Sequence, residues 1–102
     1  MPKTEITNEL NRLKDYGYEV RTFNHYKAVG RGTKGFVDHY IIGHYIIFCE
    51  VKIDKDKLKP EQIRLAEKIS AHSALYKRLH YVNIHTLAEA KKLVDNILAM
   101  KL

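Results

Sequence analysis

The chain has 102 residues, of which 45% are hydrophobic, and it carries a formal net charge of +6. This length and composition fit one globular domain with a real core, so we take residues 1–102 as a single domain. The longest apolar stretches are too short to span a bilayer, and the N-terminal residues lack the apolar segment of a signal peptide, so no membrane partner is expected. The surplus positive charge favours a polyanionic partner such as DNA or RNA.

The chain has one cysteine, Cys49, which lies within an apolar segment. A single cysteine excludes an internal disulfide and fits a reducing, cytoplasmic setting. A structural zinc site is not expected either, because the chain has one cysteine and no pair of histidines with His-x-x-x-His spacing on a helix.

The N-terminal part of the chain predicts a helix followed by a strand. The helix is expected over Thr4–Tyr16, capped by Thr4 and ended by Gly17, and the strand over Tyr18–Asn24. The helix repeats apolar residues at helical spacing, which predicts a buried stripe formed by Ile6, Leu10 and Leu13.

Residues 25–34 are predicted to form a loop rich in glycine and positive charge. Lys27, Arg31 and Lys34 are its basic residues, and its glycines permit a close approach to a phosphate backbone. We therefore expect these three side chains to bind nucleic acid. The alternative interpretation is a hairpin connection whose charges only favour solubility.

The centre of the chain predicts two strands, Phe36–Ile42 and Tyr45–Ile53, joined around Gly43 and His44. Both are apolar at nearly every position, which is typical of central strands covered on both faces.

The remaining elements are a helix, a strand and a final helix. The helix is expected over Leu58–Arg78 and the strand over His80–His85, and Thr86 begins a capping box for the last helix. The buried side of the first of these helices is expected to comprise Ile63, Leu65, Ala66 and Ile69, and that of the last helix Leu87, Ala90, Leu93, Val94, Ile97 and Leu98. The order predicts an α/β fold with an α-β-β-β-α-β core, a mixed sheet flanked by helices, and a C-terminal helix.

Three charged residues interrupt the two apolar strands: Asp38, Glu50 and Lys52. Buried charges are costly unless they are paired or bind a metal, so the three together indicate a metal site with a catalytic lysine. Mg²⁺ prefers oxygen ligands and keeps several waters, so two carboxylates and the main-chain carbonyl of Val51 would suffice. Lys52 could orient or deprotonate the attacking water, or stabilise charge that develops on a phosphate.

This hypothesis sets a condition on the hairpin register. A two-residue turn would pair residue 42 with 45 and residue 38 with 49, which puts Asp38 and Glu50 on opposite faces. A three-residue loop would pair 42 with 46 and 38 with 50, which brings the two acids side by side. A metal site therefore requires the three-residue loop or one bulge.

Gly35-x-x-Asp38, eleven further residues, Glu50-x-Lys52 and then Gln62 together resemble the motif of the PD-(D/E)XK nuclease superfamily. Within it the chain is most similar to the stand-alone VRR-NUC domains of phages, relatives of Holliday-junction resolvases with a restriction-endonuclease-like fold. The resemblance extends from the first helix to the strand at residues 80–85. One departure is Val37, where the family usually has proline before the aspartate.

The resemblance implies an endonuclease that depends on Mg²⁺ or Mn²⁺. It implies metal ligation by Asp38, Glu50 and the Val51 carbonyl, with Lys52 as the catalytic lysine and Gln62 in a supporting role. An auxiliary acid on the first helix is also implied. Glu5 fits the family's usual distance to the glycine, whereas Glu9 lies on the inward side of the helix, and Glu9 is favoured.

The same resemblance implies branched, flap or junction DNA as substrate, a homodimer, and a host-cell cytoplasmic setting if the chain is phage-encoded. A protein partner could supply specificity, because one small domain has little room for a separate recognition surface. Two other functions compete with this one. The first is a non-catalytic nucleic-acid-binding module on the same fold, which a register that separates Asp38 from Glu50 would favour. The second is a basic interaction protein that binds no nucleic acid.

Overall fold

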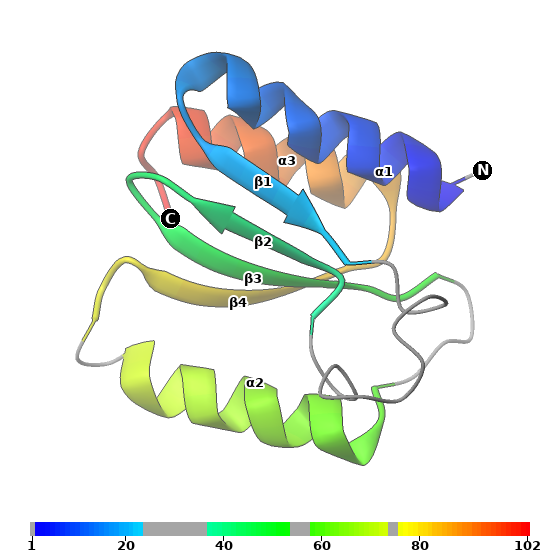
Figure 1. Ribbon diagram of the computed structural model, residues 1–102, viewed down its shortest axis with the longest axis vertical. Coiled ribbons are helices and arrows are strands. Elements are labelled where there is room, and N and C mark those ends of the chain that lie inside the picture. The colour runs from blue at the N-terminus through cyan, green and yellow to red at the C-terminus, as the bar shows by residue number, and fades with distance from the viewer. Residues whose placement is uncertain (1, 24–36, 54–57, 74–75) are drawn as a thin grey trace.

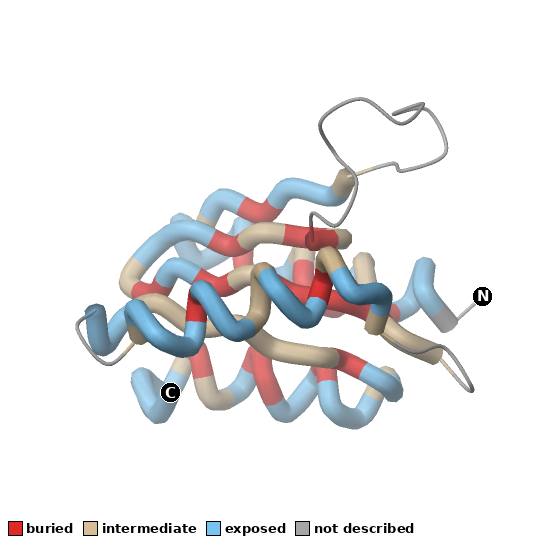
Figure 2. Tube along the Cα trace, turned by 90° about the horizontal axis from the view of Figure 1, so that it is seen from below, coloured by how far each residue is buried: buried red, intermediate tan, exposed pale blue. Residues whose placement is uncertain are grey.

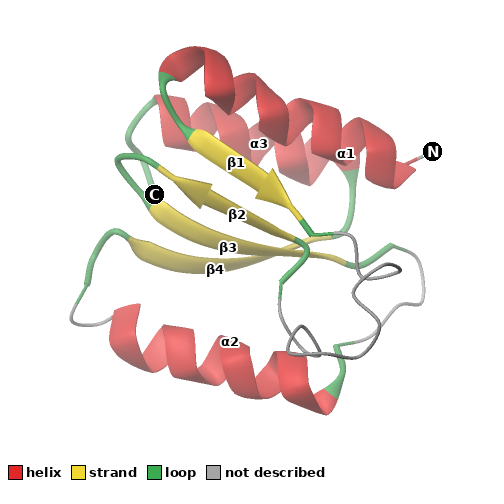
Figure 3. Ribbon diagram, in the orientation of Figure 1, coloured by secondary structure: helices red, strands yellow, loops and turns green. Residues whose placement is uncertain are grey.

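The computed structural model describes residues 2–23, 37–53, 58–73 and 76–102. Their elements follow the predicted order of an α/β fold, with a four-stranded sheet between two helical layers (Figures 1 and 3). In chain order the elements are α1 (Pro2–Asn11), the 3₁₀ helix η1 (Arg12–Tyr16), β1 (Glu19–Thr22), β2 (His39–Ile42), β3 (Ile46–Val51), α2 (Pro60–Ser73), β4 (Leu79–Ile84) and α3 (Leu87–Leu98). None of the helices in these ranges has the length and apolar character that crossing a membrane requires.

The sheet is mixed, as predicted, and its strands lie in the order β1-β2-β3-β4. β1 pairs with β2 and β2 with β3 in antiparallel fashion, whereas β3 and β4 are parallel. The parallel pair is connected through α2, which crosses the face of the sheet opposite α1 and α3 (Figure 1).

The hydrophobic core lies between the sheet and the layer formed by α1 and α3. The predicted stripe of the first helix is fully buried there, and α3 begins with the predicted capping box at Thr86. The largest contributors from the helices and the sheet are Ile6, Leu10, Leu13, Ile41, Ile47, Ile84, Val94 and Ile97. This face of the sheet is therefore closed by apolar packing.

The first helix differs from its prediction in two respects. It begins at Pro2 rather than at a Thr4 cap, because proline is compatible with a first helical turn. It also tightens into 3₁₀ geometry at Arg12–Tyr16 before it ends at Gly17, which has the left-handed φ of 90°.

The layer on the other face covers less of the sheet than predicted. α2 comprises Pro60–Ser73 and does not extend to Arg78. Ile63 is 43% exposed, and only Gln62 and Ile69 of this helix are buried. The reason is that α2 packs against β4, at one side of the sheet, and Figure 2 shows that most of its length is exposed. The expectation that both faces of the central strands are covered is therefore wrong at Ile42 and Ile46, which are 44% and 41% exposed.

The hairpin between β2 and β3 has the three-residue loop that the metal hypothesis requires. Ile42 pairs with Ile46 and His39 with Cys49, and the Gly43 amide donates to the Tyr45 carbonyl over 3.0 Å. Extending this register by one residue places Asp38 opposite Glu50.

Gly43 allows this loop to pack against an aromatic ring, and that contact generates a prediction. A Cβ atom at position 43 would lie 2.6 Å from Cε2 and 2.9 Å from Cγ of Tyr18, closer than real Cβ atoms approach. We expect Gly43→Ala to lower the free energy of unfolding by about 1–3 kcal/mol, measured by urea denaturation.

Tyr18→Ala supplies the control for this prediction. In that background the added methyl group meets no ring, so Gly43→Ala should then cost less than about 0.5 kcal/mol. An equal cost in both backgrounds would show that the ring contact is not the reason for the glycine.

Candidate metal centre

The candidate site lies where β3 ends, beside the residue that precedes β2 and the first turn of α2. Asp38 comes directly before β2, Glu50 is the penultimate residue of β3, and Gln62 is in the first turn of α2. Three separate segments of the chain thus converge on one end of the central strand (Figure 1).

Asp38 is fixed by hydrogen bonds to β3 on both sides of Glu50. Its amide donates to the Cys49 carbonyl over 3.1 Å, and its Oδ2 accepts from the Val51 amide over 2.8 Å. In a strand the N–H and C=O of one residue point to the same edge, so the Val51 carbonyl also lies on the Asp38 side of β3. The carboxylate and that carbonyl are therefore adjacent oxygen donors.

Glu50 is fully buried, and only one of its two carboxylate oxygens is paired within the described residues. Oε2 accepts a 2.8 Å hydrogen bond from Nε2 of Gln62, whose own Oε1 accepts from the Lys59 amide over 2.8 Å. Oε1 is buried and has no hydrogen-bond partner in the described part of the chain. A buried acceptor without a partner is destabilising, and native sites of this kind usually have a water or an ion for it.

Lys52 lies on the same face as Glu50. Its Nζ is 3.9 Å from Glu50 Oε2, and its side chain is 14% exposed. The Lys52 amide donates to the Ile84 carbonyl over 2.9 Å, so the residue is anchored to β4 just beyond the end of β3. The ammonium group is thus held at the rim of the site, where it is beside the carboxylate and still reaches solvent.

Burial raises the pKa of Glu50 to about 7, and the negative charge of Asp38 contributes to the rise. The positive charges of Lys52 and Lys3 oppose it. In the absence of a cation, burial and the neighbouring negative charge of Asp38 therefore disfavour the ionised form of Glu50.

These residues fit a divalent cation. The two neighbouring carboxylates, including the Glu50 Oε1 that is unpaired within the described residues, and the adjacent carbonyl are oxygen donors. A cation would offset the burial and the repulsion from Asp38 that together raise the Glu50 pKa. Within the described residues, no group of three or more His, Cys, Asp or Glu side chains could hold a metal, so this site would rely on two carboxylates and the carbonyl. Mg²⁺ can use a site with two carboxylates, with water in the remaining positions.

The auxiliary acid of the first helix is not brought into this cluster. Glu9 is 8% exposed, as expected for its inward position, but it forms an ion pair with Arg12 one turn later. Glu5 is exposed. Neither is among the charged groups that shift the Glu50 pKa. The supporting role favoured for Glu9 stays a prediction.

Other predicted residues lie outside the described ranges. These are the motif glycine and the three basic residues expected to bind nucleic acid, namely Gly35, Lys27, Arg31 and Lys34.

Lys3 is a contributor that sequence reasoning missed. It is in the first turn of α1, and its positive charge acts on Glu50 from the far end of the sequence. Nothing in the local pattern marks it, because its effect on Glu50 depends on how α1 packs in the fold.

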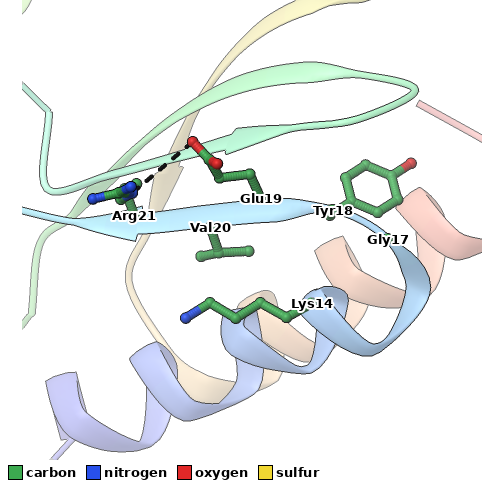
Figure 4. Close-up of a pocket in the computed structure, with 6 residues that line it drawn as sticks. All are labelled: Lys14, Gly17, Tyr18, Glu19, Val20 and Arg21. Carbon is green, nitrogen blue, oxygen red and sulfur yellow. Dashed lines mark ion pairs between the residues drawn. The ribbon is translucent and has the colours of Figure 1, made fainter.

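A surface pocket lies elsewhere on the molecule, where η1 passes into β1 (Figure 4). Lys14 and Val20 lie on one side of β1 in this view, and Glu19 and Arg21 lie on the other. Nε of Arg21 is 3.9 Å from Oε2 of Glu19. None of the candidate site residues lines it.

Comparison with known proteins bears on the fold. No protein-family model matches the sequence, and no curated protein matches it. A solved structure described as a VRR_NUC domain matches with a TM-score of 0.63 over 90% of this chain and 92% of that chain, at 22% sequence identity. The chain therefore has a VRR_NUC-like fold, as the sequence motif implied.

The buried Glu50 carboxyl generates a prediction for the metal-free protein. The pKa of Glu50 is higher in the folded state than in the unfolded state, so its protonated form stabilises the fold. This contribution to the free energy of unfolding is present in full below the unfolded-state pKa, near 4.5, and is lost as pH rises through about 7. Glu50→Gln removes this titration. In EDTA, its free energy of unfolding relative to wild type should rise by roughly 2–3 kcal/mol between pH 4.5 and pH 8.

Urea denaturation across that pH range measures the difference. Glu67→Gln, which removes the same charge from an exposed position of α2, is the matched control and should follow the wild-type profile. Parallel profiles for wild type and Glu50→Gln would mean that Glu50 is not strained by its burial.

Proposed function

We propose that this protein is a divalent-metal-dependent endonuclease that hydrolyses phosphodiester bonds in DNA. The observation that carries the proposal is the convergence of Asp38, Glu50 and Lys52 at one end of β3. Among them is a buried carboxylate oxygen that has no hydrogen-bond partner within the described ranges. The VRR_NUC-like fold supports the proposal, and Asp38, Glu50 and Lys52 belong to the sequence pattern that resembles the motif of PD-(D/E)XK nucleases.

Each residue has a role that follows from its position. Mg²⁺ or Mn²⁺ would be held by Asp38, Glu50 and the Val51 carbonyl. When bound, the ion would neutralise charge on the phosphate and lower the pKa of a water molecule. Gln62 orients the Glu50 carboxylate through its hydrogen bond to Oε2. Lys52, beside this oxygen, would orient the attacking water or stabilise the negative charge that builds on the phosphate.

The substrate proposed is branched, flap or junction DNA, cut by a homodimer whose two sites act on two strands. A net charge of +6 supports a polyanionic substrate. Lys27, Arg31 and Lys34 are proposed to contact the DNA backbone, and a protein partner could add specificity.

The test is cleavage of labelled duplex, flap and four-way-junction DNA with Mg²⁺, Mn²⁺ or EDTA. We expect metal-dependent cleavage that falls by about 10²–10⁴-fold in Lys52→Ala, because that variant loses the group that acts on the water or the phosphate. DNA binding should persist in the variant and weaken steeply with salt.

Lys92→Ala is the matched control, because Lys92 is an exposed lysine of α3, on the opposite side of the sheet. It should cleave as the wild type does. Binding without cleavage in the wild type would instead favour the non-catalytic nucleic-acid-binding module, and absence of both would remove the support for any role in DNA metabolism.

A further inference from the structure

β4, the strand next to Glu50, carries two polar residues, Tyr81 and Asn83, that have no assigned role in the candidate metal centre. β3 and β4 are parallel, with Phe48 paired to Tyr81 and Glu50 paired to Asn83. Paired residues of neighbouring strands project from the same face of a sheet, and so do residues two apart on one strand. Tyr81 and Asn83 therefore lie on the Glu50 face, on the side of β3 away from Asp38.

Both residues bury a polar atom that is unpaired within the described residues. The Tyr81 hydroxyl and Asn83 Oδ1 have this property, as does Glu50 Oε1. The Tyr81 hydroxyl also experiences the negative charge of the site. Its pKa is raised well above the ordinary value, mainly by burial and also by the charges of Glu50 and Asp38. Each such atom is destabilising if it stays unpaired, so three on one face indicate a shared polar ligand.

The chemistry of these atoms decides what the ligand is. Carboxylate Oε1 and amide Oδ1 accept hydrogen bonds only, and a tyrosine hydroxyl accepts one as well as donating one. A phosphate oxygen is itself an acceptor and is repelled by the carboxylates. Water molecules around Mg²⁺ are strong donors, and this ion keeps several of them. Asp38, just before β2, Glu50 of β3 and Asn83 of β4 form a row that is thus suited to a hydrated cation.

We propose that Tyr81 and Asn83 are positioning residues that accept hydrogen bonds from the hydration shell of the divalent ion. They would hold that shell from the β4 side, while Asp38 and Glu50 bind the ion directly. This inference rests on the proposed metal site, and it assigns β4 a role in how tightly the ion is held.

The test is Mn²⁺ affinity measured by isothermal titration calorimetry on the whole chain without DNA. Tyr81→Phe removes one hydroxyl, and Asn83→Leu replaces the amide by an apolar group of similar size. We expect each to raise the Mn²⁺ Kd by about 10-fold, the usual effect of losing an outer partner of a metal site. Asn83→Asp, which keeps an acceptor oxygen, should bind Mn²⁺ at least as tightly as wild type.

Stability in EDTA separates this role from a merely structural one. Because Tyr81→Phe and Asn83→Leu remove unpaired buried polar atoms, they should unfold at the same urea concentration as wild type or at a higher one. A structural role predicts a lower midpoint in EDTA with unchanged Mn²⁺ affinity, and that result would overturn the proposal. Tyr76→Phe, which removes a hydroxyl from a 60% exposed tyrosine, is the matched control for the chemical change.

Asp38→Asn distinguishes failure of this inference from failure of the proposed function. Loss of Mn²⁺ binding in Asp38→Asn, with wild-type affinity in both β4 variants, would overturn only the role of β4. No Mn²⁺ binding by the wild type would overturn the metal-dependent function and this inference together.

Discussion

The candidate site depends on a buried carboxylate that lacks a full set of hydrogen-bond partners among the residues that the structure describes. Glu50 is inaccessible to solvent, has one oxygen bonded to Gln62, and has its ammonium neighbour, Lys52, 3.9 Å away. An apolar side chain at this position would give a more stable sheet, because desolvation of a charge often exceeds what its partners return. The sequence instead keeps the acid and surrounds it with groups that orient it, which is the pattern of a binding site.

The geometry of that site is decided at the opposite end of the hairpin. Side chains alternate between faces, so one residue fewer in the loop would turn Asp38 to the α1–α3 face, away from Glu50. The three-residue loop prevents this, and Gly43 allows it to pack on Tyr18. The length of this loop thus determines whether two acids four pairs further along lie on the same face.

Much of this arrangement was predictable from the sequence. Apolar runs set the order of strands, a capping box marked the start of α3, and charges inside apolar strands marked Asp38, Glu50 and Lys52. The register could be reduced to two alternatives but not chosen, because both loop lengths are compatible with the same residues.

What escaped prediction depends on packing between elements rather than on local pattern. Ile63 has the spacing of a buried residue, yet it is exposed because α2 lies over β4 and leaves much of the sheet uncovered. Lys3 lies far from Glu50 in the sequence and acts on it through the placement of α1. The unpaired atoms of Tyr81 and Asn83 become visible only when β4 is aligned with β3.

The two faces of the sheet carry different kinds of side chain, and the incomplete cover by α2 is related to this difference. α1 and α3 close one face with apolar side chains, which gives the domain most of its core. The other face carries the polar row, and α2 reaches it with Gln62 rather than with a leucine or an isoleucine. A helix that covered the whole face would improve burial but would exclude a polymer from the carboxylates. Under the proposed function, the exposed part of this face would give DNA access to the carboxylates and would limit the size of the core.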